Sequence, residues 1–547
     1  MMGKEITISK NKSHSSSSVV IIGGFLVFLS SLVSIKANAN TITEATIYKQ
    51  SIVNIQQITS NSNRSVNNIT NRLNKLRERI EVQSTRKSLQ ECLEIGLMQN
   101  MQLAAGYASI QQQEFTLLAT KRQYLPTLSL SSLTPFLGKV YTYSRTDTDY
   151  YRTTSQVVPT SDGTDEVLYS GGYVNSYSTS KHDYKQFAPY ITLSWSFFQP
   201  SLWASIQAEN AEVGQQMLVF NVTARSAVLQ IQEAYFKLQS TQRLIIAFEE
   251  IYRANLEQVK MIEAQERAGL VDIGSVEHAR TQLYSQLNQL IQYYQSLLQD
   301  SASLALAMNQ PSDLMFLPVH SLEKGEPWTI GLDETIDQAL ALREEIKSYL
   351  QTKRAAIWNA RSAIRKYLPV LSFQGVGYGY KQKGSEYVDS EPVQDVDYLY
   401  KQASIGIGLT WTLFDGGVYG AEADSYMASA KNAEYEAEYS RYTVREQVRK
   451  SYASYEMSIL DLLNTKDNLD AAENSLAVNR SRFSVGLSDI TTLVQGMQLL
   501  GQATENHIKA LLQHNQSVAE LYRYSAIWPE GIESLINERK QELKNDM

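Results

Sequence analysis

Hydrophobic residues recur at alternating spacings of four and three along two long stretches of the chain. The first stretch lies between Pro200 and Gly269, and its seam also includes the polar residues Thr241 and Asn255. Its apolar members are Ala227, Ile231, Ala234, Leu238, Ile245, Phe248, Tyr252, Val259 and Ile262. The second seam consists of Val444, Val448, Tyr455, Leu462, Leu469, Ala472, Leu476 and Phe483. A sustained repeat of about 3.5 residues predicts supercoiled helices, here over residues 202–267 and 417–484, each roughly 100 Å long.

Four shorter stretches also predict helices, over residues 88–123, 275–309, 333–366 and 489–526. The first opens with Ser88 followed by Glu91, which is a capping-box pattern. Each of these helices would measure ~50 Å, about half the length of a long one. We therefore expect two short helices, stacked end to end, to pack along each long helix.

Runs of alternating apolar and aromatic residues, bounded by residues that break helices, predict four strands. The first begins at about residue 127 and includes Leu128, Leu130, Leu133, Tyr141 and Tyr143, and the second covers 187–198. The other two cover 369–381 and 403–414. The polar stretches between the strands of each pair, about 146–182 and 382–402, are interpreted as loops.

Three short motifs occur twice in the same order. Tyr124-Leu125-Pro126 recurs as Tyr367-Leu368-Pro369, Leu193–Phe198 recurs as Leu409–Phe414, and Ala268–Ile273 recurs as Val485–Ile490. An internal repeat indicates one structural unit built twice. We therefore divide the chain into a first repeat (88–309), a connector (310–332), a second repeat (333–526) and a C-terminal tail (527–547).

The N-terminus has the pattern of a secretory signal peptide over residues 1–39. A basic segment precedes the apolar run from Val19 to Val33, and Ala37-Asn38-Ala39 fits the small-residue cleavage pattern. The alternative is a membrane anchor, although the apolar run is shorter than the ~20 residues a spanning helix needs. Residues 40–87 form an extension, in which Val66, Ile69, Leu73, Leu76 and Ile80 predict either a short docked helix or part of a mobile arm.

Four strands in one chain cannot form a closed sheet, and open sheet edges invite aggregation. A membrane barrel must be closed and needs about eight strands or more, so two or three copies would have to combine. Aromatic residues near the strand ends suggest a membrane-interface girdle or, alternatively, the cover of a soluble sheet. They are Tyr141, Tyr143, Tyr184, Tyr190, Trp195, Tyr378, Tyr380, Tyr398, Tyr400 and Trp411.

The ordered set of motifs resembles the TolC family of outer-membrane channel proteins. The resemblance rests on the two Tyr-Leu-Pro motifs, on Trp411–Gly417 after the last strand, and on Arg482–Leu487 at the end of the second long helix. It covers about residues 88–526. It implies an α+β membrane protein, in which a long coiled-coil barrel of helices continues into a transmembrane β-barrel of four strands per chain and twelve in a homotrimer.

The resemblance further implies a passive conduit that carries small molecules or secreted proteins across the outer membrane, with its helices in the periplasm. Its expected partners are a periplasmic adaptor protein and an inner-membrane pump of the ABC, RND or MFS type, together with outer-membrane lipid. No cofactor is expected. The sequence does not distinguish drug efflux from type I protein secretion, and a periplasmic coiled-coil protein without a channel is the alternative reading.

The two glycine turns that end the long helices are the candidate working sites. Gly269 and Gly486 suit left-handed helix ends, and Asp272 and Asp489 suit caps of the following helices. By resemblance, the tips that would contact an adaptor comprise Gly269, Leu270, Asp272, Gly486, Leu487 and Asp489. The implied gate residues are Gly274, Ser275, Ser488, Thr492 and Gln495. Acidic side chains line the gate in the best-known family pattern, whereas Thr492 and Gln495 are neutral, so we expect weak cation selectivity.

Composition and motifs argue against other classes of function. Fifty basic and 57 acidic residues give a net charge of −7, which does not provide the basic field that nucleic acid requires. None of the six histidines lies in a metal-binding motif, and His507 and His514 are expected to be solvated. Gly375, Gly377 and Gly379 lie in a predicted strand, so they favour close strand packing over phosphate binding. No catalytic constellation is present, and Cys92, the only cysteine, excludes an internal disulfide.

Overall fold

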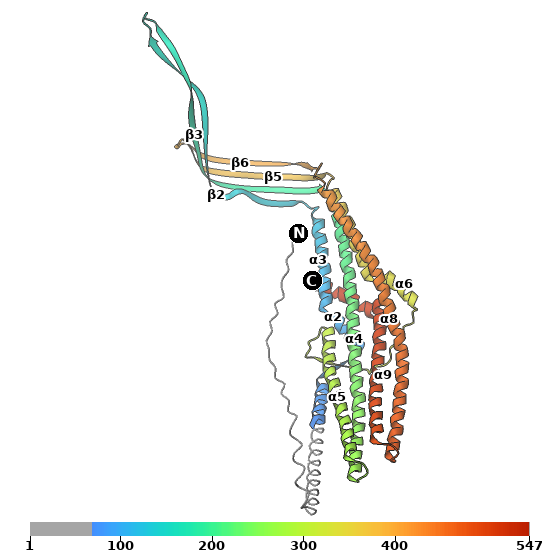
Figure 1. Cartoon of the computed structure of the whole chain (residues 1–547). Coiled ribbons are helices and arrows are strands. Elements are labelled where there is room, and N and C mark those ends of the chain that lie inside the picture. Colours follow the sequence, from blue (N-terminus) through green and yellow to red (C-terminus); the bar gives the residue numbers. More distant parts are fainter. Residues whose placement is uncertain (1–67, 546–547) are drawn as a thin grey trace, which may run out of the picture. The chain divides into compact units, whose positions relative to one another are not determined.

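The computed structural model describes residues 68–545 (Figure 1), apart from the side chains of residues 133–136. The chain divides into two compact units, Met1–Arg79 and Ile80–Met547. In the first unit, residues 68–79 are helical, as the spacing of Leu73 and Leu76 predicts. The predicted signal peptide lies outside the described residues. The second unit holds the remaining helices and both sheets described below.

Two long helices form the structural framework of the second unit. Helix α4 (Pro200–Arg267) has 68 residues and helix α8 (Val418–Ser484) has 67, which confirms both predicted rods. The predicted seam of α4 is buried except at Ala234, which is half-buried, and its buried members include Ile231, Leu238 and Ile262. Its polar member Thr241 donates a 2.6 Å hydrogen bond to Asp300 of the neighbouring helix α5 (Ile273–Ala307). The periodic pattern therefore identifies both the apolar contacts and a polar contact that fixes the helix register.

Short helices pack along α4 as the lengths predicted. Helix α3 (Met101–Arg122) covers its beginning, where Leu117 packs against Leu202, and α5 covers its end, where Phe248 stacks edge-on against Tyr293. The two short partners meet near the middle of α4, because the backbone N–H of Met101 donates to the side chain of Asn309 at 3.4 Å. The end-to-end arrangement is thus confirmed for the first repeat.

In the second repeat, helix α7 (Glu344–Arg365) and helix α9 (Ile490–Ser525) both pack against α8. The sequence predicted single helices over 88–123 and 333–366, and both predictions are wrong in one respect. Helix α2 (Leu89–Met98) is separated from α3 by Asn100, whose side chain caps α3. Helix α6 (Leu332–Leu342) is separated from α7 by Arg343, whose backbone is extended (ψ 121°). The capping box of Ser88 and Glu91 is present as predicted.

Four antiparallel strands form one sheet in the order β2-β3-β5-β6, visible side by side in Figure 1. They are β2 (Thr127–Pro159), β3 (Asp165–Phe198), β5 (Val370–Val388) and β6 (Glu391–Thr410). The predicted loops over 146–182 and 382–402 are wrong, because these stretches pair as continuations of the hairpins. Their Thr and Tyr residues suit strands as well as loops. The second hairpin turns at Asp389 and Ser390, which both have positive φ angles, as tight two-residue turns require.

The register gives the sheet one apolar and one polar face over the strand halves nearest the helices. Residues directly opposite one another on antiparallel strands point to the same face, and Leu128 pairs with Leu193, which pairs with Gly375, which pairs with Ile405. Leu128 and Ile405 are 74% and 78% exposed, so this apolar face lies uncovered within the described chain. The intervening positions are largely small or polar: Ser129, Thr192, Ser194, Ser372, Gln374, Ser404, Gly406 and Gly408.

Elements that were not predicted join the connector and the tail to the body. Strand β1 (Ser84–Lys87) pairs in parallel with β4 (Met315–Pro318), and helix α10 (Ile532–Asn545) follows the second repeat. Lys540 of α10 donates a 2.8 Å hydrogen bond to Asn221 of α4. These short segments lack a long periodic pattern, which is the signal that sequence analysis relies on.

The repeated motifs meet at the junction between sheet and helices. The indole N–H of Trp195 donates to the carbonyl oxygen of Tyr124 at 2.7 Å, and that of Trp411 donates to the carbonyl oxygen of Tyr367 at 2.9 Å. In each repeat, the end of one strand is thereby tied to the turn that enters the other. The duplication of the motifs therefore reflects one junction built twice.

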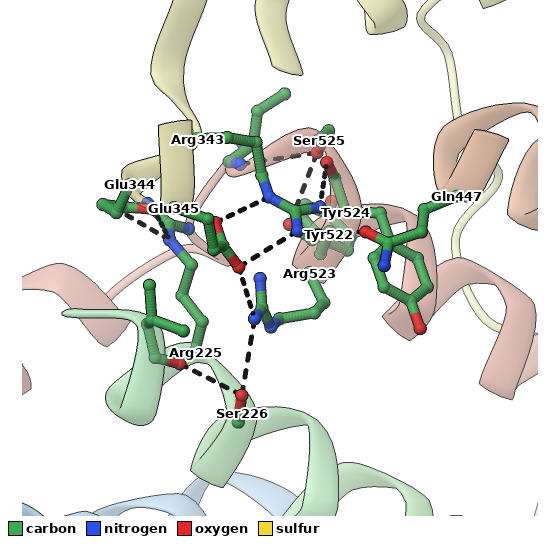
Figure 2. A network of polar contacts seen from close by, with 12 residues as sticks. Arg225, Ser226, Arg343, Glu344, Glu345, Gln447, Tyr522, Arg523, Tyr524 and Ser525 are labelled. Carbon is green, nitrogen blue, oxygen red and sulfur yellow. Dashed lines mark hydrogen bonds and ion pairs between the residues drawn. The ribbon is translucent and has the colours of Figure 1, made fainter. Parts of the chain in front are cut away.

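A network of ion pairs joins the two repeats (Figure 2). Arg225 of α4 pairs in a fork with Glu344 of α7, with the closest N–O distance 2.9 Å and both side chains buried. Glu345 lies between Arg343 and Arg523, at 2.8 and 2.9 Å. Arg523 belongs to α9, so the network links the first repeat to both ends of the second.

We predict that Glu345 makes the stability of the fold sensitive to acid. Burial alone would raise the pKa of Glu345, but hydrogen bonds and charges from Arg343 and Arg523 outweigh burial and lower this pKa to about 2. A carboxylate with a lowered folded-state pKa contributes stability above its unfolded pKa of roughly 4.3, and this stability is lost as the pH falls through the folded pKa. The unfolding temperature of the detergent-solubilised protein should therefore fall between about pH 4.5 and pH 2, and less steeply in Glu345→Gln.

The control is Glu257→Gln, which removes a carboxylate whose ion pair with Lys260 is exposed at the surface. Exposed pairs contribute little to stability, so this variant should keep the pH profile of the parent protein. Equal profiles for Glu345→Gln and the parent would contradict the assigned role.

Candidate functional site

The long helices end in two tips of the same construction. Gly269 and Gly486 follow α4 and α8 with φ angles of 75° and 74°. The N–H of Leu270 donates to the carbonyl oxygen of Gln265 at 2.9 Å, and the N–H of Leu487 donates to that of Arg482 at 2.8 Å. This left-handed glycine with a bond back across the last turn is the Schellman form of helix ending, as the sequence predicted.

Aspartates begin the helices that leave the tips. Asp272 accepts hydrogen bonds from the backbone N–H and hydroxyl of Ser275, at 3.2 and 2.7 Å. Asp489 accepts the corresponding pair from Thr492, both at 2.8 Å. The side chain of Ser275 thus lowers the pKa of Asp272, and the backbone N–H of Thr492 lowers that of Asp489. Both carboxylates are exposed, so each tip presents negative charge to solvent.

An exposed leucine stands at the same position of each tip. Leu270 is 74% and Leu487 is 72% exposed. Neither side chain therefore contributes to the core of the described chain. A large apolar side chain held on a rigid capped turn is the kind of anchor that a partner protein can bury.

The residues implied as a gate lie at or just after these turns. Gly274 and Gln495 are exposed, whereas Ser488, Ser275 and Thr492 are half-buried. Ser275 and Thr492 already donate their hydroxyl groups to the capping aspartates. Ser488 and Gln495 take no part in these caps, and Gln495, one turn beyond the cap of α9, is the more exposed of the two.

A groove lined by amide side chains lies between α5 and α9 and was not predicted. It has a volume of about 350 Å³. Its lining residues are Phe248, Gln282, Ser285, Gln286, Gln289, Met497, Gln498, Gly501, Gln502 and Glu505. The amide of Gln498 donates to Gln282 at 2.6 Å, which joins the tips of the two repeats. The spacing of glutamines at 282, 286 and 289 is a helical stripe that could have identified this face from the sequence.

Tyrosines gather on the polar face of the sheet. Tyr378 and Tyr400 both donate to the side-chain oxygen of Gln402, at 2.7 and 2.6 Å. The rings of Tyr380 and Tyr400 stack 5.2 Å apart, and Tyr398 and Tyr190 complete the cluster. The register places all five on the face opposite Leu193 and Ile405. The residues of the predicted girdle are therefore divided between the two faces, because Trp195 shares the face of Leu193 whereas these five do not, and the sequence alone did not fix the face of each residue.

Two of the three predicted glycines of β5 pack closely, whereas the prediction is wrong for Gly377, where an added Cβ atom would meet nothing within 4 Å. A Cβ atom at Gly375 would lie 3.3 Å from the Cγ2 atom of Ile405, and one at Gly379 would lie 3.0 Å from the carbonyl oxygen of Tyr400. Both glycines lie within a strand with no helix following them directly, so the phosphate-cradle alternative has no structural basis here.

The histidines differ from expectation in one respect. His514 is fully buried and its Nδ1 atom lies 3.0 Å from the hydroxyl of Ser458, so the prediction that it is solvated is wrong. It packs against Tyr455 within the helix interface. Among residues 68–545, no group of three or more His, Cys, Asp or Glu side chains is arranged to hold a metal ion. Within the same residues, none of the helices combines the length and the hydropathy needed to cross a membrane.

Comparisons with known proteins show which family the chain belongs to. A family model described as outer membrane efflux protein matches residues 140–310 and 335–526, which is more than half of the chain. The chain belongs to the outer membrane efflux protein family. Outer membrane protein TolC of Escherichia coli (strain K12) is 23% identical over 367 residues, covering 63% of this chain and 71% of its own length.

Solved structures of outer-membrane proteins share the fold. The Campylobacter jejuni CmeC outer membrane channel matches with a TM-score of 0.61 and 15% identity, over 83% of this chain and 89% of that chain. The outer membrane protein VceC from Vibrio cholerae matches with a TM-score of 0.58 and 14% identity, over 80% and 95%. The family resemblance and the α+β fold inferred from the sequence are thereby confirmed.

We predict that Gly486 is required by its backbone angle, because its φ of 74° disfavours any residue with a Cβ atom. Gly486→Ala should loosen the tip by roughly 1 kcal/mol and speed amide hydrogen exchange at residues 482–487. Gly420→Ala is the matched control, because its added Cβ also meets open space but its backbone lies within α8. The same protection at the tip in both variants would show that the left-handed turn contributes nothing.

Proposed function

We propose that the chain is one protomer of a homotrimeric outer-membrane channel for the export of small molecules or proteins. The observation that carries the proposal is a four-stranded sheet with an uncovered apolar face. Three copies would supply twelve strands, which closes a barrel and removes every open edge. In this assembly Leu128 and Ile405 face lipid, while the serines, glycines and tyrosines of the other face line the pore.

The helices would form a tunnel that continues from the barrel into the periplasm. Each chain would contribute two long helices of roughly 100 Å with their short partners. The tips would then lie farthest from the outer membrane, where an adaptor protein and an inner-membrane pump can reach them. Leu270 and Leu487 are the proposed adaptor anchors, and the capped turns of Asp272 and Asp489 hold them in place.

The gate would lie at the helix tips, near the start of α9, where Gln495 is located. A neutral ring of Thr492 and Gln495 would discriminate weakly between cations and anions. The exposed carboxylates of Asp272 and Asp489 would supply what cation preference remains. No step in this conduit requires a cofactor or a chemical reaction.

The native mass of the detergent-extracted protein tests the assembly. We expect a particle of three protomers, each of 61.7 kDa before any processing, because three copies supply the twelve strands of the proposed barrel, whereas a dimer would form one of eight strands. The mass is measured by light scattering with the bound detergent subtracted. A monomer, or a protein that leaves the membrane fraction without detergent, would instead favour a periplasmic coiled-coil protein without a channel.

Ion selectivity tests the gate. Gln495→Glu would add one carboxylate per protomer, so the ratio of cation to anion permeability in planar bilayers should rise at least severalfold. Gln513→Glu adds the same charge on α9 farther from the tip and should change the ratio much less. If both variants shift the ratio equally, the constriction does not lie at Gln495.

A further inference from the structure

A row of lysines crosses the sheet beyond its apolar band. Lys139 of β2 is the register partner of Lys185 of β3, which is in turn the partner of Lys383 of β5. All three side chains are exposed. Directly opposed residues of antiparallel strands point to the same face with Cβ atoms about 5 Å apart. Three positive charges are therefore held side by side by the backbone.

This arrangement is unfavourable unless something neutralises it, because like charges directly opposite one another destabilise a sheet. Lys139 has one partner, Asp183 at 2.8 Å. Among the described residues, Lys185 and Lys383 have no ion pair. Asp397 is the register partner of Lys383, but its carboxylate lies nearest Lys381, at 4.0 Å. Asp395 lies on the same face one row farther out, as the register partner of Ser385, so four lysines and three aspartates leave the patch with a small positive balance.

The lysine row lies on the same face as the exposed leucines. One row nearer the helices, Leu137, Phe187 and Leu399 are the register neighbours of Lys381, and each of the three is more than 40% exposed. The apolar band continues from there to Leu371 and Leu409. Between Leu371 and Lys383 the strand advances ~40 Å, or roughly 30 Å along the membrane normal at a barrel tilt of about 40°. An apolar band of about 25 Å would place the row just beyond the hydrocarbon.

We propose that Lys139, Lys185 and Lys383 form a binding site for the phosphate groups of phosphorylated glycolipid in the outer leaflet. The proposal rests on the proposed function, since it requires the apolar face to contact lipid and the row to lie on the side away from the helices. Lysine binds phosphate as a point charge, and its long stem can lie along acyl chains while the ammonium reaches the headgroup. An anionic headgroup would relieve the repulsion within the row.

The test compares two triple variants of the full-length protein. In Lys139→Gln, Lys185→Gln, Lys383→Gln, we expect binding of fluorescent lipopolysaccharide to weaken by roughly fivefold for each lysine lost. The control is Lys260→Gln, Lys450→Gln, Lys509→Gln, which removes the same charge from exposed helix positions and should bind as the parent does. Lipopolysaccharide stripped of its phosphates should bind the parent and the row variant equally.

Three outcomes would overturn the site. They are undiminished binding by the row variant, equal loss in the helix control, and full binding of the dephosphorylated lipid by the parent. Competition by millimolar inorganic phosphate alone, without preference for the lipid, would also reject a lipid site. The native mass of each variant is measured in parallel. A trimer that does not bind lipopolysaccharide rejects only this inference, whereas a parent protein that is not a trimer rejects the proposed function.

Discussion

An apolar sheet face that residues 68–545 leave uncovered is the constraint on which the rest of this structure depends. The four strands expose Leu128, Ile405 and their neighbours on one side and leave β2 and β6 each with an open edge. The exposed apolar face and the open edges are both unfavourable in water, because unpaired backbone groups and exposed apolar area promote association. Lipid favours the same face and requires that the edges be closed. Membership of the outer membrane efflux protein family agrees with this reasoning.

The internal repeat meets a mechanical requirement at the junction between sheet and helices. Neighbouring strands of a sheet lie closer together than packed helices do, so the chain must turn sharply where a strand joins a helix. The same Trp-to-Tyr hydrogen bond secures this turn in both repeats, through Trp195 and Trp411. The two repeats are then joined to each other by the buried fork of Arg225 and Glu344. A buried ion pair is costly to break on one side, so this network favours a single relative placement of the repeats.

Much of the fold could be predicted from the sequence because its long helices carry a sustained period. The seam of Ile231, Leu238 and Ile262, and the tip glycines, follow from local rules that hold in any context. The breaks at Asn100 and Arg343 were missed because each interrupts the helix for only one or two residues, which a periodic pattern does not resolve. The extent of the hairpins was missed because polar strands and polar loops share a composition. The face of each tyrosine depended on register, which pairing partners decide and a single strand does not.

The candidate site likewise has parts that the sequence predicts and parts that it does not. Its tips are built from contacts within a few residues, so Gly269, Asp272, Gly486 and Asp489 were predictable one by one. The amide groove between α5 and α9 and the lysine row across β2, β3 and β5 arise from residues far apart in the chain. No local rule brings Gln282 to Gln498, or Lys139 to Lys383. Local chemistry thus specifies the tips that a partner would touch, while long-range pairing specifies the amide groove and the lysine row.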